Sequence, residues 1–221
     1  MFAAGACLVL LTACAATQPS RAPAEAQSGF LHDYSQLTSD PQDPGFRHYT
    51  STDLGAGQYR SFLIEDLSFI VNTGQAYQAL DTARLRELSD YYRTQMTAML
   101  QARHYQVAQA AGPGVARLRV AVVGLSQVSS QFKPSDLIPA KMLFNVARMA
   151  TDTSPHVLRM SIEGEVLDSK SGQVLGATID GRESGATVAG SKTSPSADQV
   201  HELIDFWVAR FGERLDRIAA H

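Results

Sequence analysis

The sequence contains only two cysteines, Cys7 and Cys14, among its 221 residues. Both lie in an apolar N-terminal run that has the features of a secretion signal, and cleavage before Cys14 would remove Cys7. The mature chain would then keep a single cysteine, so no internal disulfide is possible. A domain outside the cytoplasm without disulfides depends on its hydrophobic core for stability.

The sequence also lacks a long hydrophobic run. Its N-terminal apolar segment has about a dozen residues, whereas a helix that crosses a bilayer needs ~20. A retained transmembrane helix is therefore not expected. A buried N-terminal helix or strand is disfavoured as well, because a tail of Ala, Pro, Ser and Gln follows directly.

Charge is sparse and nearly balanced, with 19 Lys and Arg against 22 Asp and Glu, for a net charge of −3. A chain without a basic excess gives no indication of nucleic-acid binding.

The first residues carry neither Lys nor Arg, although signal peptides usually begin with one. We therefore expect an in-frame start upstream of Met1.

The N-terminus does contain Leu11-Thr12-Ala13-Cys14, the pattern of a bacterial lipoprotein signal. The small residues before the cysteine fit a narrow peptidase site, and Cys14 supplies the thiol that receives a diacylglyceryl group. Stable anchoring takes at least two acyl chains, which a lipoprotein cysteine carries. The sequence predicts a signal peptide over 1–13 and lipidation, with palmitate-type chains, at Cys14.

The residues that follow the cysteine predict where the domain works. Ala15 stands where the sorting rule of enteric bacteria has Asp for retention in the inner membrane, which favours the periplasmic face of the outer membrane. Residues 14–29 show no apolar periodicity, which is typical of a flexible tether. At ~5–6 Å × √n, about fifteen residues reach roughly 20 Å. A single periplasmic domain, predicted over 30–221, would therefore stay close to the bilayer.

Hydrophobic patterning predicts about five strands and two amphipathic helices in this domain. Asp81 is expected to cap the first helix, whose apolar residues recur three or four positions apart as far as about Ala102. Ser196 and Gln199 fit a capping box at the start of the second helix. The expected strands are 61–71, 104–108, 116–125, 156–168 and 173–183.

Two hairpins are expected among these strands. The turn from Asp168 to Gly172 gives the stronger signal, and a Gly-Pro-Gly turn follows the strand at 104–108. Locally paired strands with two amphipathic helices predict an α+β fold, in which a mainly antiparallel sheet is covered on one face by both helices. The segment from Phe30 to Gly45, in which Asp40-Pro41 and Asp43-Pro44-Gly45 are expected to form turns, is predicted to be irregular and to pack onto this domain.

Three motifs resemble catalytic or binding signatures, and each is incomplete. Residues 201–205 have Asp where a zinc-binding helix has its second His, and residues 185–193 have one residue too many for a phosphate loop. Residues 124–128 lack the last Gly of a nucleophile elbow. The six histidines show no ligand spacing. The sequence therefore predicts no catalytic residue, no cofactor and no metal, and lipidated Cys14 is the one predicted site residue.

Together with the lipoprotein signal, the segments 28–37 (SGFLHDYSQL) and 163–175 (EGEVLDSKSGQVL) resemble a bacterial family of lipoproteins of unknown function, over nearly the whole chain. That resemblance implies no activity, cofactor or catalytic residue. More distantly, the hairpin followed by a C-terminal helix is similar to small α/β domains of the curli-secretion lipoprotein and the Tol-system propeller protein. Those domains bind other envelope proteins, and the analogy is one of fold only.

Two functions remain open at this point. The anchor, the short tether and the incomplete motifs favour a non-catalytic outer-membrane lipoprotein that docks an envelope protein partner. The alternative is a small-molecule or lipid-binding protein, or an enzyme, with a pocket under the 126–155 and 184–196 segments. A concave pocket would favour the alternative, and a flat apolar patch would favour docking.

Overall fold

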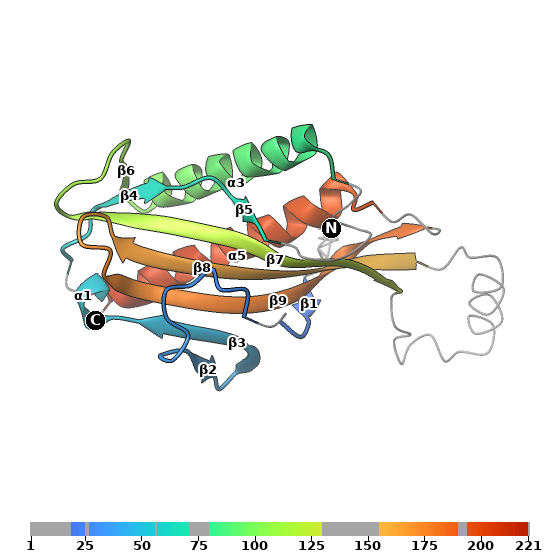
Figure 1. The fold of residues 1–221 in the computed structure, drawn as a ribbon, viewed down its shortest axis with the longest axis horizontal. Coiled ribbons are helices and arrows are strands. Elements are labelled where there is room, and N and C mark those ends of the chain that lie inside the picture. The colour runs from blue at the N-terminus through green and yellow to red at the C-terminus, as the bar shows by residue number, and fades with distance from the viewer. Residues whose placement is uncertain are drawn as a thin grey trace, which may run out of the picture.

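The protein has an α+β fold, in which helices α3 (Thr82–Ala102) and α5 (Ala197–Ala219) cover one face of a large mixed sheet (Figure 1). The predicted fold class and the placement of two helices on one face are therefore confirmed. The sheet has nine strands among the described residues and is larger than the predicted five. The structure is a computed structural model that describes residues 19–24, 27–55, 57–70, 80–129, 155–189 and 194–220.

The sheet has the order β2-β3-β9-β8-β7-β4-β6, with β1 beside β9 and β5 beside β7. Its centre consists of three long strands that pair antiparallel, β7 with β8 and β8 with β9. The strands are β1 (Ser20–Arg21), β2 (Thr38–Asp40), β3 (Asp43–Thr50), β4 (Ser61–Ile64), β5 (Ser68–Phe69), β6 (Gln106–Val107), β7 (Val115–Ser129), β8 (Pro155–Asp168) and β9 (Val174–Ala189).

The predicted hairpin between β8 and β9 is confirmed. The Asp168 carboxylate accepts hydrogen bonds from the backbone N–H of Lys170, at 3.1 Å, and of Ser171, at 2.7 Å. Gly172 has a φ of 75°, which a residue without a side chain adopts without strain. These local interactions close the turn at the residues that the sequence indicates.

The predicted hairpin between 104–108 and 116–125 is wrong. β6 pairs parallel with β4, and β4 lies between β6 and β7. The predicted strand at 61–71 is also divided, into β4 and β5, which both run parallel to β7. A parallel neighbour requires a crossover connection, and α3 supplies it between β4 and β7. The sheet is therefore mixed, with its parallel pairs on this side.

The helices begin where their capping residues predict. Asp81 accepts a hydrogen bond from the Arg84 N–H at 2.8 Å, and Ser196 and Gln199 form the complete capping box. A third helix, α1 (Thr52–Gly55), is a single turn after β3. No helix in the described ranges is long and apolar enough to cross a membrane. Buried side chains of α3 and α5 form one core with the sheet, including Leu88, Met96, Leu203, Ile204 and Leu215.

The face of the sheet opposite the helices is covered by residues 27–37, which we call the strap. Leu31 and Leu37 of the strap pack against Ala177 and Ile179 of β9 in a second, smaller hydrophobic cluster. The expected irregular packing is confirmed as far as Leu37 and is wrong beyond it, where β2 and β3 form. Just before the strap, β1 pairs with β9. The first described strand thus lies within the range that the sequence assigns to the tether.

Strands β2 and β3 were not predicted, because their sequence is rich in turn-forming residues. Only the two residues between Asp40 and Asp43 form the turn, and β3 continues as a regular neighbour of β9. In that position alternate side chains of β3, including Phe46 and Thr50, lie on the face that carries α5. β3 therefore contributes to the cavity that this helix covers.

Candidate functional site

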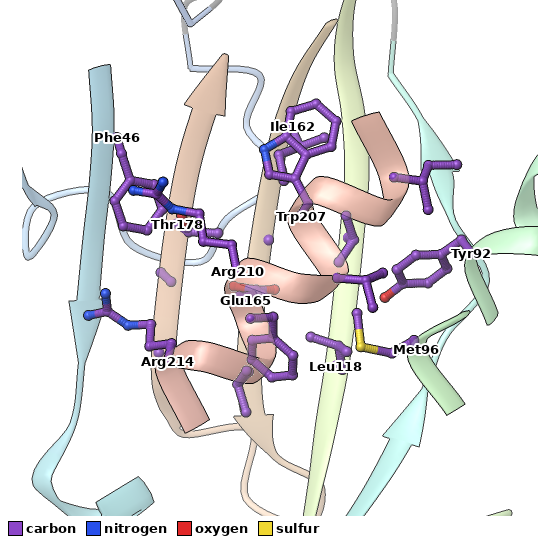
Figure 2. Close-up of a pocket in the computed structure, with 18 of the residues that line it drawn as sticks. Phe46, Tyr92, Met96, Leu118, Ile162, Glu165, Thr178, Trp207, Arg210 and Arg214 are labelled. Atoms are coloured by element: carbon purple, nitrogen blue, oxygen red, sulfur yellow. The ribbon is translucent and has the colours of Figure 1, made fainter. Parts of the chain in front are cut away.

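An open cavity of about 110 Å³, which we call the α5 cleft, lies between α5 and the helix-covered face of the sheet. Figure 2 shows α5 crossing the strands that form its floor, with α3 at one end. For comparison, an engineered apolar cavity of ~150 Å³ stays dry and binds benzene. The lining is mostly apolar and includes Met96, Leu118, Val120, Ile162, Trp207 and Phe211.

The strands that form the floor of the cleft leave space below α5 because two of the residues there are glycines, which have no side chain. Gly164 of β8 and Gly176 of β9 both line the cavity. A Cβ at Gly164 would lie 3.3 Å from Cγ2 of Thr178 and 3.6 Å from Cγ2 of Val120, in the direction of the helix-covered face. Larger residues here would fill the space under α5. The cleft therefore exists because Gly164 and Gly176 lie under α5 and leave space between the sheet and the helix.

Trp207 is the only tryptophan of the chain and lies in the roof of the cleft. Its indole N–H donates to the Asp180 carboxylate at 2.9 Å. Asp180 also accepts from Arg182 at 3.0 Å, and its burial raises the pKa of this carboxyl. The buried ion pair fixes the indole over the floor. An intrinsic fluorophore is thus built into the wall of the cavity.

Two arginines of α5 line the end of the cleft that adjoins β3 (Figure 2). The Arg210 guanidinium stacks on the ring of Phe46 at 3.9 Å and lies 3.2 Å from the Asp43 carboxylate. Arg214 donates to the Thr50 hydroxyl at 2.8 and 3.1 Å, and it forms no ion pair within the described residues. Burial and the neighbouring Arg217 lower the pKa of Arg214 to about 10, which leaves it charged at neutral pH.

Tyr92 of α3 lies at the other end of the cleft and is 4% exposed. Figure 2 shows its hydroxyl oxygen turned toward the middle of the cavity. This hydroxyl has no hydrogen-bond partner in the part of the chain that the structure describes. Burial raises the pKa of Tyr92, so the group is a neutral donor and acceptor. Buried hydroxyls are normally paired, and this one is available to a ligand.

A second polar cluster joins the strap to the opposite face of the sheet. Glu163 is 0% exposed and accepts from the Ser28 N–H at 2.9 Å, the Ser28 hydroxyl at 2.7 Å and the Tyr34 hydroxyl at 2.6 Å. Glu165 is 1% exposed, accepts from the His32 N–H at 3.1 Å and pairs with Arg119. Both carboxylates are engaged in holding the strap, which is a structural role.

The incomplete motifs of the sequence have structural roles. His201 stacks on Tyr91 at 3.8 Å, and Asp205 accepts from the Tyr91 hydroxyl at 2.9 Å, so residues 201–205 join α5 to α3. The Glu202 carboxylate accepts from two N–H groups at the start of the 185–193 segment. Residues 124–128 lie within β7 and form no elbow. Within the described ranges, no group of three His, Cys, Asp or Glu side chains is arranged to hold a metal.

Two predicted features fall largely beyond the described residues. Cys14 precedes residue 19, where the description begins, and the same is true of the predicted signal peptide. The loops expected to cover a pocket begin as strands, because β7 continues to Ser129 and β9 to Ala189, and much of the rest is not described. The α5 cleft lies elsewhere, and the sequence did not indicate it.

The described part of the protein is thus a mixed sheet with the strap on one face and the α5 cleft under the helices on the other. The chain belongs to the family described as "Protein of unknown function (DUF3313)", whose model matches residues 26–211. This range contains both segments on which the resemblance was based, and the expected membership of a family of unknown function is confirmed. That the lipoprotein signal and these two segments are marks of the family stays a prediction. No protein with a curated description matches the chain.

Several solved structures are loosely similar. A candidate neuraminyllactose-binding hemagglutinin homologue from Helicobacter pylori is 12% identical, with a TM-score of 0.43, over 74% of this chain and 86% of that one. The PelC dodecamer from Paraburkholderia phytofirmans is 10% identical, with a TM-score of 0.34, over 73% and 93%. Lipoprotein GNA1162 from Neisseria meningitidis is 14% identical, with a TM-score of 0.34, over 69% and 98%.

Proposed function

We propose that the protein is a lipid-anchored, non-catalytic binding protein at the periplasmic face of the outer membrane, and that it binds an apolar ligand in the α5 cleft. The proposed anchor is the acylated Cys14 of the lipoprotein signal. The observation that carries the binding role is the preformed cavity under α5, which is open and has a mostly apolar lining. Such cavities are the usual form of small-molecule sites.

The energetics favour binding over an empty core. Protein interiors are normally close-packed, and an unfilled apolar cavity costs stability. A ligand that places ~four methylene groups under α5 would gain about 3 kcal/mol at ~0.8 kcal/mol per methylene. The gain requires no rearrangement of the floor, since its shape is set by Gly164 and Gly176. The cleft is therefore pre-organised for an apolar group.

Docking of an envelope protein is a second candidate function. The observation in its favour is that Phe46 and Thr50 of β3, which has only the short β2 beyond it in the sheet, line one end of the cleft. A partner could insert an apolar side chain at this side of the domain. Binding of a small apolar ligand by the isolated protein would favour a ligand-binding function over docking. A protein partner would need contacts with the surface around the cleft as well as with the cleft itself.

The experiment uses the full chain carrying Cys14→Ser, which cannot be acylated and is studied without detergent. We expect octanol, a neutral apolar probe, to change Trp207 fluorescence saturably and to raise the Tm by mass action. Val120→Phe places a ring in the cavity and should abolish both effects. Val174→Phe makes the same exchange at the β8–β9 hairpin, outside the lining, and should retain them.

Circular dichroism would confirm that both variants are folded. An unchanged Trp207 signal and Tm at saturating octanol would contradict the proposal. Equal octanol binding by the wild-type chain and a folded Val120→Phe variant would contradict it as well, because the probe would then occupy another place.

A further inference from the structure

The β3 end of the α5 cleft has more positive than negative charge. Arg21, Arg182 and Arg210 all pair with the Asp43 carboxylate, and Arg182 pairs with Asp180 as well, so three arginines face two carboxylates. Arg214, one turn further along α5, forms no ion pair in the described part of the chain. Like charges four residues apart on a helix repel one another. An anion at this end would relieve that repulsion.

The Arg214 side chain is positioned to bind such an anion. Its Nε and Nη2 both donate to one neutral acceptor, the Thr50 hydroxyl, and no described carboxylate is in ion-pair contact with it, since Asp40 acts on its charge only at longer range. A guanidinium presents parallel N–H groups that match a carboxylate or phosphate. Arg210 beside it is held by the Phe46 ring, and its buried Nε has no hydrogen-bond partner in the described ranges.

The inner end of the cleft gives an independent indication of a ligand. The Tyr92 hydroxyl is buried, is directed toward the cavity and is unpaired within the described residues (Figure 2). A polar atom in such a place is normally satisfied by a ligand or by ordered water. Unpaired polar groups thus occur at both ends of a cavity whose lining is mostly apolar and includes Glu165 and Thr178 between them.

We infer that the α5 cleft binds an anionic amphiphile, with its carboxylate or phosphate at Arg214 and Arg210 and its acyl part under α5 against Trp207. This inference rests on the proposed function, since it names the class of ligand for the same cavity. A free fatty acid and an anionic membrane lipid share this chemistry. The two sources are distinguished by the experiment.

The test compares three probes of equal chain length, octanoate, octanol and octylammonium, by Trp207 fluorescence with the full Cys14→Ser chain. We expect octanoate to bind about tenfold more tightly than octanol, because a charge-assisted hydrogen bond to Arg214 is added. Octylammonium should bind more weakly than octanol. In Arg214→Ala the preference for octanoate over octanol should disappear.

Matched variants separate the charge effect from loss of folding. Arg214→Glu should reverse the preference, so that octylammonium binds more tightly than octanoate, and a misfolded chain would show no such gain. Arg86→Ala removes an exposed arginine of α3 and should keep the wild-type preference. Equal affinities of the wild-type chain for octanoate and octanol would overturn the inference, and so would an unchanged preference in Arg214→Ala.

The failure of the proposed function has a different signature, since then none of the three probes would change Trp207 fluorescence. A vesicle arm identifies the source of the ligand. Capture of the chain by phosphatidylglycerol vesicles, lost in both Arg214→Ala and Val120→Phe, would support a membrane lipid as the ligand. Octanoate binding without capture by vesicles would support a free fatty acid.

Discussion

Replacement of Glu163 by Ala should release the strap from the sheet. The Glu163 carboxylate is fully buried and accepts hydrogen bonds from the N–H and hydroxyl of Ser28 and from the hydroxyl of Tyr34. An alanine provides no acceptor for any of these donors. The Ser28 N–H and the proton of the Tyr34 hydroxyl would then have no acceptor, or the strap would move away so that water could reach them. The Tyr34 oxygen would still accept from the N–H groups of Gly29 and Leu31.

The expected loss of stability follows from these contacts. A hydrogen bond to a charged group is worth ~1.5–3 kcal/mol, and each buried donor left without an acceptor costs ~1–3 kcal/mol. Glu163→Ala removes the acceptor of the Ser28 N–H and of the Tyr34 hydroxyl together, so we expect it to lower the free energy of unfolding by about 3–5 kcal/mol. That is a large part of the ~5–15 kcal/mol of a typical domain.

The assay is urea denaturation, with hydrogen exchange at the strap amides as a local measurement. Glu183→Ala is the matched control on the next strand, because Glu183 pairs with Arg159 at 2.6 Å and is partly exposed. That pair should contribute under about 1 kcal/mol. The reasoning would be refuted if Glu163→Ala cost no more than Glu183→Ala and the Ser28 amide kept its protection from exchange.

Three further predictions concern single residues. Tyr92→Phe should stabilise the ligand-free protein by about 1 kcal/mol in urea, since it removes an unpaired buried hydroxyl; destabilisation would show that the hydroxyl has a partner. The Ser171 N–H and hydroxyl lower the pKa of Asp168 to about 2, below its model-peptide value of 3.8. The ionised Asp168 carboxylate therefore contributes fully to stability above pH 3.8, and this contribution is lost as the pH falls to 2. The Tm values of wild type and Asp168→Asn should differ above pH 3.8 and converge at pH 2. A difference in Tm that persists at pH 2 would contradict this prediction. Gly181→Ala places a Cβ 2.8 Å from the Ala22 carbonyl and should cost about 1–3 kcal/mol, with faster exchange of the Ala22 amide; unchanged exchange would contradict the close approach.

The features that sequence reasoning predicts correctly depend on neighbouring residues. Asp81 and the Ser196–Gln199 pair fix the starts of α3 and α5, because each cap bonds to backbone groups within one turn. The turn at 168–172 closes through its own side chain in the same way. Capping and turn motifs of this kind involve only a few neighbouring residues, so they can be recognised in the sequence without knowledge of the fold.

The pairing of the strands was not predictable in this way. The pattern of residues shows that 61–64 and 106–107 suit strands, but it does not show that β4 lies between β6 and β7. That arrangement depends on α3 crossing the sheet, which is a property of the whole chain. β3 was missed for a related reason, since its pairing with β9 outweighs the turn-forming residues at its start.

The α5 cleft was hidden for the same reason. In the sequence Gly164 is only a small residue between two glutamates, and the register of β8 is needed to show that it lies under α5 while Glu163 and Glu165 bond to the strap. The two segments that carried the family resemblance, 28–37 and 163–175, meet in this contact. The two segments are therefore close in space, although they are far apart in the sequence.

A crystal structure of the full Cys14→Ser chain with octanoate would test the central claim most directly. We expect octanoate to lie under α5, with its carboxylate within hydrogen-bond distance of the Arg214 guanidinium and its chain against Trp207. Octanoate bound at another place, or a cleft without octanoate at a saturating concentration, would contradict it.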